Sequence, residues 1–223
     1  MTAYLVLLRG INVGGKNKVP MAELRNVLED AGFSNVSTYI ASGNVFLDSD
    51  LSASKVAETI EAALPKAFKL DAELIKVRML TADQLEAVVK NRPKGFGDEP
   101  AKYHNDAIFL MGIDADQAIA VFSPREGVDK VWPGNGVIYS QRLSAERTKS
   151  RLGRIVGTPP YKSMTIRSWQ TTLALLWLIR RHYDCWHGDR LGTAVREEGR
   201  GLDLEPAEPA ASRSRTTHRR QRR

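Results

Sequence analysis

Cysteine and histidine, the residues that build disulfide frameworks and most metal sites, are scarce in this sequence. One of the 223 residues is cysteine, Cys185, and four are histidine. A single cysteine excludes a disulfide framework, and the spacing of the cysteine and the histidines matches no clustered metal site. We therefore expect a reducing compartment, with the cytoplasm as the predicted location, and neither a metal nor a cofactor.

Long apolar runs are also absent. The segment LALLWLI at 173–179 is far short of the roughly 20 residues that a membrane-spanning helix needs. The opening residues, MTAYLVLLRG, have no cationic region before the apolar ones and no small-residue cleavage site, so they indicate a strand instead of a signal peptide. With 42% apolar and 26% charged residues, the composition is typical of a soluble globular protein. We expect no membrane partner.

Acidic residues are scarce in one part of the chain. The net charge is +7, yet residues 1–80 contain nine basic and nine acidic side chains. Residues 142–180 contain eight basic side chains and one acidic side chain. This local excess of positive charge would raise the concentration of an anionic partner near the end of the folded region.

Lysine is absent after Lys162, and the composition changes after about residue 180. The last 43 residues contain ten arginines, three of the four histidines and no apolar periodicity. Such a segment buries too little apolar surface to offset its chain entropy. Two interpretations remain, a basic tail that binds nucleic acid or an out-of-frame translation of a GC-rich gene. We predict an irregular Arg-rich tail over 181–223 and base no function on it.

The first 80 residues alternate between strand and helix patterns. Each predicted helix has an apolar face at the helical period, and the second places Val56, Ile60 and Leu64 on one side. The order βαββαβ is that of a ferredoxin-like split βαβ unit. The predicted strands are 3–11, two runs within 36–49 that are separated by a bend at 41–44, and 72–80; the predicted helices are 20–33 and 54–68.

The second half repeats this order less distinctly. A capping box formed by Thr81 and Gln84 predicts a linking helix that ends near Asn91. We therefore predict an α+β fold with two ferredoxin-like (βαββαβ) plaits in tandem, over 1–80 and 81–180. The further predicted elements are strands at 105–112 and 163–169, a helix at 114–123, a hairpin over 128–141, a basic helix at 145–156 and a last helix from Gln170.

Four motifs resemble one protein family. RGINVGGKNKVPMAELR begins at Arg9, TYIASGNVF begins at Thr38, a hairpin extends from Trp132 to Tyr139, and TIRSWQT surrounds Trp169. Together they are similar to the bacterial family named domain of unknown function 1697, over residues 1 to about 175. The resemblance implies a pair of ferredoxin-like domains in a cytoplasmic bacterial protein, and it implies no activity. Ser168 and Gln170 depart from the family, whose ending more often has asparagine, and the Arg-rich tail lies outside its pattern.

The segment at 9–20 is close to a phosphate-binding loop. GINVGGKN fits the pattern G-x-x-x-x-G-K-[ST] except at its last position, where Asn17 cannot supply the hydroxyl that binds magnesium. Lys18 and Pro20 also separate the motif from the helix whose N-terminus would face the phosphate. A nucleoside triphosphatase is therefore disfavoured.

A simpler anion site is the functional interpretation of this loop. Cationic side chains and the free N–H groups of a glycine turn attract phosphate or carboxylate. In the alternative interpretation the glycines only satisfy positive φ, the asparagines hold the turn, and the lysines are solvated. The predicted ligand-binding residues are Arg9, Asn12, Gly14, Gly15, Lys16, Lys18, Ser42 and Asn44.

A second candidate surface is basic. On the predicted helix at 145–156, Arg147, Arg151 and Arg154 share one face by i, i+4, i+7 spacing. Arg167 follows, and Trp169 offers a stacking surface, so these five residues are possible nucleic-acid contacts. The alternatives are a solvated helix face and a tryptophan that anchors the core.

Isolated acid–base candidates complete the set. His104 beside Asp106 would suit a general base, although a loop histidine without a catalytic role is the alternative. Asp48 and Asp50 would suit a divalent ion, or they are charges that solubilise a strand end. Cys185 lies in the predicted tail and receives no role.

The sequence supports three hypotheses of function. The first is a non-catalytic module that binds an anionic, phosphate-bearing ligand or nucleic acid near the loop from Arg9 to Lys18, in a cleft between the two domains. The second is an enzyme that acts on a nucleotide or phosphorylated substrate with Lys16 as an electrostatic clamp. The third is a pair of domains that chiefly form a dimer.

Overall fold

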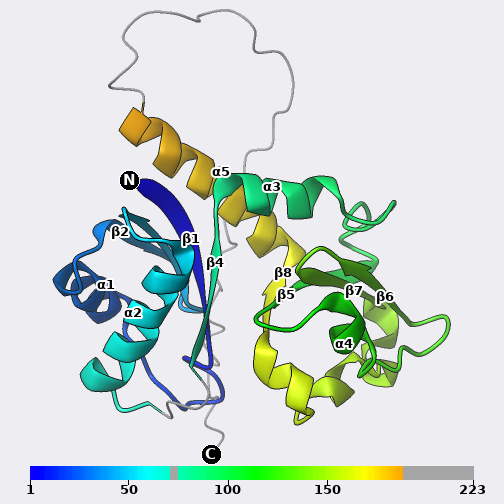
Figure 1. Cartoon of the computed structure of the whole chain (residues 1–223). Helices are drawn as coiled ribbons and strands as arrows, with labels where there is room; N and C mark the ends of the chain where they lie inside the picture. The colour runs from blue at the N-terminus through cyan, green and yellow to red at the C-terminus, as the bar shows by residue number, and fades with distance from the viewer. Residues whose placement is uncertain (71–74, 188–223) are drawn as a thin grey trace, which may run out of the picture. The chain divides into compact units, whose positions relative to one another are not determined.

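The computed structural model describes residues 1–70 and 75–187 (Figure 1). Within these residues the chain forms two four-stranded antiparallel sheets with helices packed on them, so the predicted α+β class is confirmed. Residues 188–223, most of the predicted tail, lie outside the described residues. Among the described helices, none has the length and hydrophobicity required to span a bilayer.

The first sheet is central to its half of the chain. Its middle strand β1 has six consecutive buried residues, because both of its faces are covered. Val6 and Leu8 pack with α1 and α2, whereas Leu5 and Leu7 belong to a second core on the opposite face. The strand order in this sheet is β2-β3-β1-β4. Along the chain the elements are β1 (Thr2–Arg9), α1 (Met21–Asp30), β2 (Ser34–Tyr39), β3 (Asn44–Ser49), α2 (Ala53–Ala67) and β4 (Lys76–Leu80).

The second sheet has the corresponding strand order, β6-β7-β5-β8. The capping box of Thr81 and Gln84 is confirmed at the start of α3, and a second one, formed by Asp114 and Gln117, begins α4. α4 is shorter than the predicted helix at 114–123. The elements are α3 (Ala82–Lys90), β5 (Tyr103–Leu110), α4 (Ala115–Ile119), β6 (Asp129–Gly134), β7 (Val137–Leu143), β8 (Met164–Ser168) and α5 (Trp169–His187).

The basic helix predicted at 145–156 is wrong. The chain instead forms three 3₁₀ segments, η2 (Ser144–Lys149), η3 (Leu152–Ile155) and η4 (Pro159–Ser163). The physical reason is a long-range contact: the carboxylate of Asp129 accepts the backbone N–H of Arg151 at 2.8 Å, and Ser150 has extended φ/ψ. The helical face of arginines therefore does not form, and Arg147, Arg151 and Arg154 are separately exposed.

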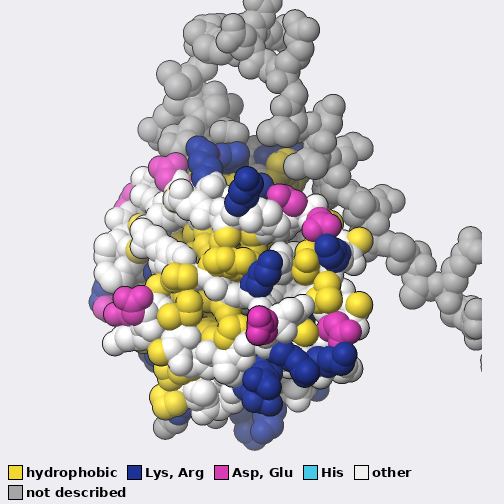
Figure 2. All heavy atoms as spheres, turned by 90° about the vertical axis from the view of Figure 1, so that its right-hand side faces the viewer, with side chains coloured by type: hydrophobic (Ala, Val, Ile, Leu, Met, Phe, Trp, Pro, Cys, Tyr) yellow, Lys and Arg dark blue, Asp and Glu magenta, His cyan; other side chains and the backbone are white. Residues whose placement is uncertain are grey.

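On its outer face the second sheet packs against the short α4 and the 3₁₀ segments in a third core, which includes Ile108, Ala118 and Ile155. Figure 2 shows hydrophobic side chains gathered in the middle of this side of the molecule, with charged side chains around them. Partly buried apolar residues adjoin this core, namely Ile113, Ala115, Ile119, Val121, Phe122, Val131 and Tyr161.

Between the two sheets lies one shared core, to which α3 and α5 also contribute. Phe96 is at its centre, with edge-to-face ring contacts to Trp169 at 5.0 Å, to Tyr139 at 5.3 Å and to Trp132 at 6.0 Å between centroids. Such edge-to-face contacts add to the stabilisation from buried area. The two halves are thus joined by aromatic packing. The domain boundary near residue 80 stays a prediction.

Because Tyr139 is buried in this core, we predict that the protein loses stability at alkaline pH. Its hydroxyl donates a 2.7 Å hydrogen bond to the carbonyl oxygen of Val88, and burial raises the pKa of Tyr139 to about 12. An unfolded tyrosine ionises near about pH 10, so the folded state holds the phenolic proton more tightly. The resulting stability is complete below about pH 10 and is lost as the pH rises through about 12.

We expect the free energy of unfolding of the wild type to fall more steeply than that of Tyr139→Phe between those pH values. The expected difference is about 2–3 kcal/mol, from about two units of pKa. Urea unfolding followed by circular dichroism at each pH measures it. Parallel declines of the two proteins would show that Tyr139 does not titrate in this way.

Candidate functional site

The glycines of the N-terminal loop form a tight turn. Val13 and Lys16 make an antiparallel bridge in which the Lys16 N–H donates to the Val13 carbonyl oxygen at 3.0 Å. Gly14 and Gly15 between them have φ values of +58° and +76°, the pattern of a type I′ turn. The loop is therefore a small hairpin, and a P-loop would require it to continue directly into a helix.

The asparagines of this loop use their side chains to hold its shape. The Asn12 amide nitrogen donates to the carbonyl oxygens of Val19 and Ala41, both at 2.9 Å, and its oxygen accepts the Val19 N–H at 2.8 Å. Asn17 donates to the carbonyl oxygen of Gly10 at 2.7 Å. These bonds favour the structural interpretation of the asparagines.

The cations of the loop differ in their surroundings. Lys16 and Lys18 are exposed. The Arg9 Nε donates to the Met164 carbonyl oxygen at 3.1 Å, and its guanidinium carbon lies 5.4 Å from the Tyr161 ring centroid. Burial lowers the pKa of Arg9, and the interaction with Tyr161 partly opposes this shift. Arg9 thus contacts the second half of the chain.

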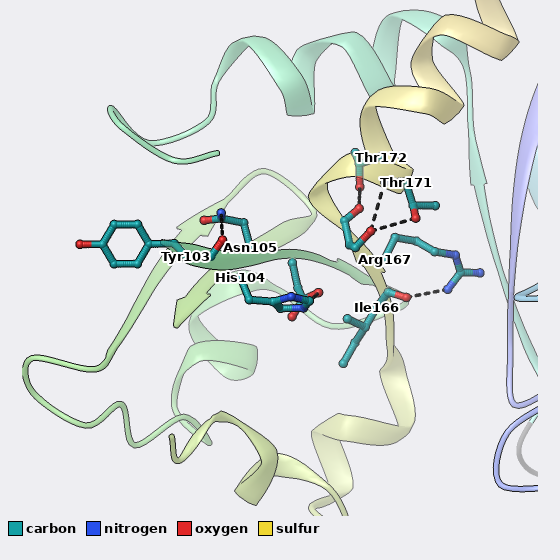
Figure 3. A network of polar contacts seen from close by, with 9 residues as sticks. Tyr103, His104, Asn105, Ile166, Arg167, Thr171 and Thr172 are labelled. Atoms are coloured by element: carbon teal, nitrogen blue, oxygen red, sulfur yellow. Dashed lines mark hydrogen bonds and ion pairs between the residues drawn. The ribbon is translucent and has the colours of Figure 1, made fainter. Parts of the chain in front are cut away.

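Arg167 lies in the interior, with 6% of its surface exposed. Figure 3 shows its side chain extending from β8 away from the second sheet. Burial lowers its pKa to about 10. All five N–H donors of the guanidinium are used within the chain. Nε donates to the Asn44 Oδ1 at 2.5 Å. Nη1 donates to the Thr165 Oγ1 at 2.9 Å and to the Ile166 carbonyl oxygen at 2.8 Å. Nη2 donates to the carbonyl oxygens of Leu8, Ser42 and Gly43 at 3.1, 3.0 and 3.3 Å.

This arrangement joins residues that the sequence had assigned to two different sites. Asn44 is fully buried, and its amide nitrogen donates to the Tyr39 carbonyl oxygen at 3.0 Å and to the Ser42 Oγ at 2.9 Å. Arg167 therefore fastens β8 to the β2–β3 bend, a position that leaves no guanidinium N–H for nucleic acid. Trp169 is buried in the aromatic core, so its ring is not an exposed stacking surface.

The remaining sequence candidates make contacts with several different groups. His104 Nε2 and Asp106 Oδ1 are 3.0 Å apart on β5, and burial raises the pKa of Asp106 against the opposing effects of His104 and Arg142. Asp50 pairs with the N-terminal amine at 2.8 Å. Asp48 is buried and accepts the Asn35 amide at 2.7 Å. The side chain of Cys185 is not among those that the structure describes.

A cavity of about 200 Å³ lies where β4, α3 and the turn between β6 and β7 meet. We call it the Arg78 cavity. Its basic side chain comes from an edge strand of the first sheet, and its other polar groups are amides and one phenol. The lining residues are Arg78, Leu80, Gln84, Ala87, Val88, Asn91, Asn135 and Tyr139.

Arg78 is the unusual group in this lining. Its Nε is buried and has no hydrogen-bond partner within residues 1–70 and 75–187, and burial lowers its pKa. Gly136, at φ +68°, permits the close approach: a Cβ atom there would lie 3.1 Å from the Arg78 Nη2. Arg78 was not predicted as a site residue, because in AELIKVRML it alternates with apolar residues as any solvated strand residue does.

Comparison with known proteins identifies the family. The family model described as protein of unknown function (DUF1697) matches residues 1–139, more than half of the chain. The chain belongs to the DUF1697 family. A solved structure of a conserved bacterial protein from Streptococcus pneumoniae is similar at 30% identity with a TM-score of 0.66, covering 80% of this chain and 98% of that one. No curated protein matches the sequence.

Some of the candidate residues lie within the part of the chain that the DUF1697 model matches, and others lie beyond it. Every residue that lines the Arg78 cavity lies within the matched residues 1–139, and so does the loop at 9–18. Arg167 and Trp169 lie beyond them, although the similarity to the solved structure extends over more of the chain. The cavity is therefore built entirely from the part of the chain that defines its membership in DUF1697.

Proposed function

We propose that this protein is a non-catalytic module of two ferredoxin-like plaits, residues 1–80 and 81–180, that binds a small anionic ligand in the Arg78 cavity. The observation that carries the proposal is the buried Nε of Arg78 without a partner. A buried N–H group that lacks a hydrogen-bond partner costs free energy. An anion in the cavity would supply the missing acceptor, and a carboxylate or phosphate suits the planar guanidinium.

The amides of the lining support a polar ligand. The Gln84 Oε1 accepts a hydrogen bond from the Thr81 N–H at 3.0 Å. The amide nitrogen of Gln84, which is a donor, therefore points away from that N–H group. Asn91 and Asn135 each add a side-chain amide to the lining. An anion that also carries hydroxyl or carbonyl groups would use these side chains together with Arg78.

The size of the cavity favours a small anion over nucleic acid. A volume of about 200 Å³ corresponds to roughly seven times the share of one water molecule in the liquid. Pockets for drug-sized ligands range from about 300 to 1,000 Å³. A compact carboxylate or phosphate fits this volume, and a strand of nucleotides would have to bind elsewhere.

The chemistry of the lining supports binding instead of catalysis. Its residues include no histidine and no carboxylate that would act as a general base. Tyr139 keeps its proton because its pKa is raised to about 12. The enzyme hypothesis with Lys16 as a clamp needs an acid–base group beside the loop, and His104 instead pairs with Asp106 on the second sheet.

A thermal-shift experiment tests the Arg78 cavity against the loop. The probes are phosphate, acetate, malate, glycerol 3-phosphate, AMP and a short single-stranded oligonucleotide. A ligand at a hundredfold excess over its dissociation constant stabilises by about 2.7 kcal/mol. We expect one of the small anions to stabilise the wild type and the double variant Lys16→Ala, Lys18→Ala, and to leave Arg78→Met unchanged. If the loop variant alone loses the response, the anion binds at the loop; no response to any probe contradicts anion binding.

In the absence of ligand, we expect the same Arg78→Met variant to be more stable than the wild type. Methionine keeps much of the side-chain volume and needs no hydrogen-bond partner, so the unliganded protein should become more stable by about 1 kcal/mol. Urea unfolding at neutral pH measures this change, and Arg78→Lys serves as the control that retains a positive charge. A loss of stability in Arg78→Met would show that the guanidinium already has a favourable partner.

A further inference from the structure

A second groove, separate from the Arg78 cavity, lies between strand β2 and helix α5. Its volume is about 710 Å³. The strand side contributes consecutive residues, and the helix side contributes residues one turn apart. The lining residues are Asn35, Ser37, Thr38, Tyr39, Phe46, Trp177, Leu178, Arg181 and His182.

The strand that borders this groove is an open edge. β2 is the outermost strand of the first sheet, and among the described strands it pairs with β3 alone. Natural sheets protect such edges with charged side chains and proline. β2 has the sequence SNVSTY, with neither, and its one irregularity is the bulge between Ser34 and Ser37. Two of the other edge strands in the described sheets carry such residues, namely Lys76 in β4 and Lys130 and Pro133 in β6.

The groove is lined by three consecutive residues of β2. Successive strand residues point to opposite faces of a sheet, yet Ser37, Thr38 and Tyr39 all line the groove. A groove confined to one face would touch only alternate residues. These three residues are also the part of β2 in continuous register with β3, because a bulge interrupts the register between Ser34 and Ser37.

The helix side of the groove is cationic and aromatic. The Arg181 guanidinium lies 4.6 Å from the centroid of the Trp177 ring, which is 48% exposed. His182 Nε2 is 3.0 Å from the buried Asp48 Oδ1, an interaction that fixes the ring beside the groove. Asp48 is 1% exposed, so the lining presents two basic side chains and no accessible carboxylate.

We propose that the groove between β2 and α5 binds an extended peptide segment that carries a carboxylate. The peptide adds a strand to the edge at Ser37–Tyr39 through backbone hydrogen bonds, as in other cases of β-strand addition. Its carboxylate pairs with Arg181, and an apolar side chain packs against Trp177. A second copy of β2 would not supply this carboxylate, since its sequence SNVSTY has no acidic residue.

Selection from a display library of random heptapeptides, with the full chain as bait, tests the proposal. We expect the enriched peptides to share an acidic residue or to depend on a free C-terminal carboxylate. Fluorescence anisotropy of the enriched peptides should show at least about tenfold weaker binding to Arg181→Glu. The matched control is Lys130→Glu, a charge reversal on the edge strand β6, which should bind as the wild type does.

Backbone methylation of the peptide separates strand addition from side-chain recognition. N-methyl groups on the alternate amides that face β2 should abolish binding, and the same groups on the opposite edge should have little effect. Equal effects of both patterns overturn strand addition. Absence of any enriched peptide, undiminished binding to Arg181→Glu, or selective binding of an oligonucleotide to the groove overturns the proposal itself.

Discussion

Replacing Arg167 by leucine is expected to lower the free energy of unfolding by about 3–5 kcal/mol, because several buried acceptors would lose their donor at roughly 1–3 kcal/mol each. Arg167 donates from all five of its N–H groups, to Asn44 and Thr165 side chains and to carbonyl oxygens in β1, β8 and the β2–β3 bend. Leucine would leave these buried acceptors without donors. Each unsatisfied acceptor carries a desolvation cost.

Urea unfolding followed by circular dichroism measures the change, and Arg147→Leu is the matched control. Arg147 is exposed on η2, so its replacement should alter stability by no more than about 0.5 kcal/mol. Arg167→Lys should lose most of the same stability, because an ammonium has three donors on a compact head and cannot reproduce the planar fork. Comparable stabilities of Arg167→Leu and Arg147→Leu would refute the role assigned to Arg167.

Replacing Gly97 by alanine is expected to cost about 3 kcal/mol. Gly97 has a φ of +87°, and a Cβ atom there would lie 2.5 Å from the Trp169 Cδ1. The indole is rigid and 2% exposed, with its ring against Phe96, so it has no room to move aside. Overpacking of a core costs about 1–3 kcal/mol, and the positive φ adds roughly 1 kcal/mol.

Gly95→Ala separates these two contributions. Gly95 has a similar φ of +80°, but a Cβ atom there would meet nothing within 4 Å. Its replacement should therefore cost only the backbone part, roughly 1 kcal/mol. Tryptophan fluorescence during urea unfolding measures both variants. Equal losses at the two glycines would show that the contact with Trp169 is not tight.

These two sites explain how the halves of the chain are joined. Arg167 links β8 to the first sheet by hydrogen bonds, and Gly97 allows the loop after α3 to approach Trp169 in the shared core. Neither depends on the proposed ligands. A variant that lowers stability at these sites while retaining the anion response of the Arg78 cavity would confirm that structure and binding are separable.

The local elements were predictable because their signals are local. The strand pattern at 3–11, the apolar face of Val56, Ile60 and Leu64, and the capping box at Thr81 all have counterparts in the structure. Each depends on residues within one or two turns or on alternation along one strand. The basic helix at 145–156 failed for the complementary reason, since Asp129 from another strand binds the chain there.

The candidate sites were predictable only in part. The loop at 9–18 and the bend at Ser42 and Asn44 do lie at the junction of the halves, through Arg9 and Arg167. Whether each side chain faces a ligand or the protein interior depends on residues more than a hundred positions away. Arg78 shows the converse, because a strand arginine with no distinctive sequence pattern lines a cavity, with an Nε that lacks a hydrogen-bond partner among the described residues.

The sequence by itself determined most of the strands and helices, the cap at Thr81 and the glycine turn at 14–15, and its motifs indicated the DUF1697 family. Those features arise from neighbouring residues, whose spacing decides which faces are apolar. Only the tertiary structure decided that Arg167 is buried, that the Arg78 Nε has no hydrogen-bond partner among the described residues, and that β2 is an edge strand. A side chain's hydration, charge partners and accessibility are set by segments that folding brings beside it, and the spacing of residues along the chain contains no direct record of them.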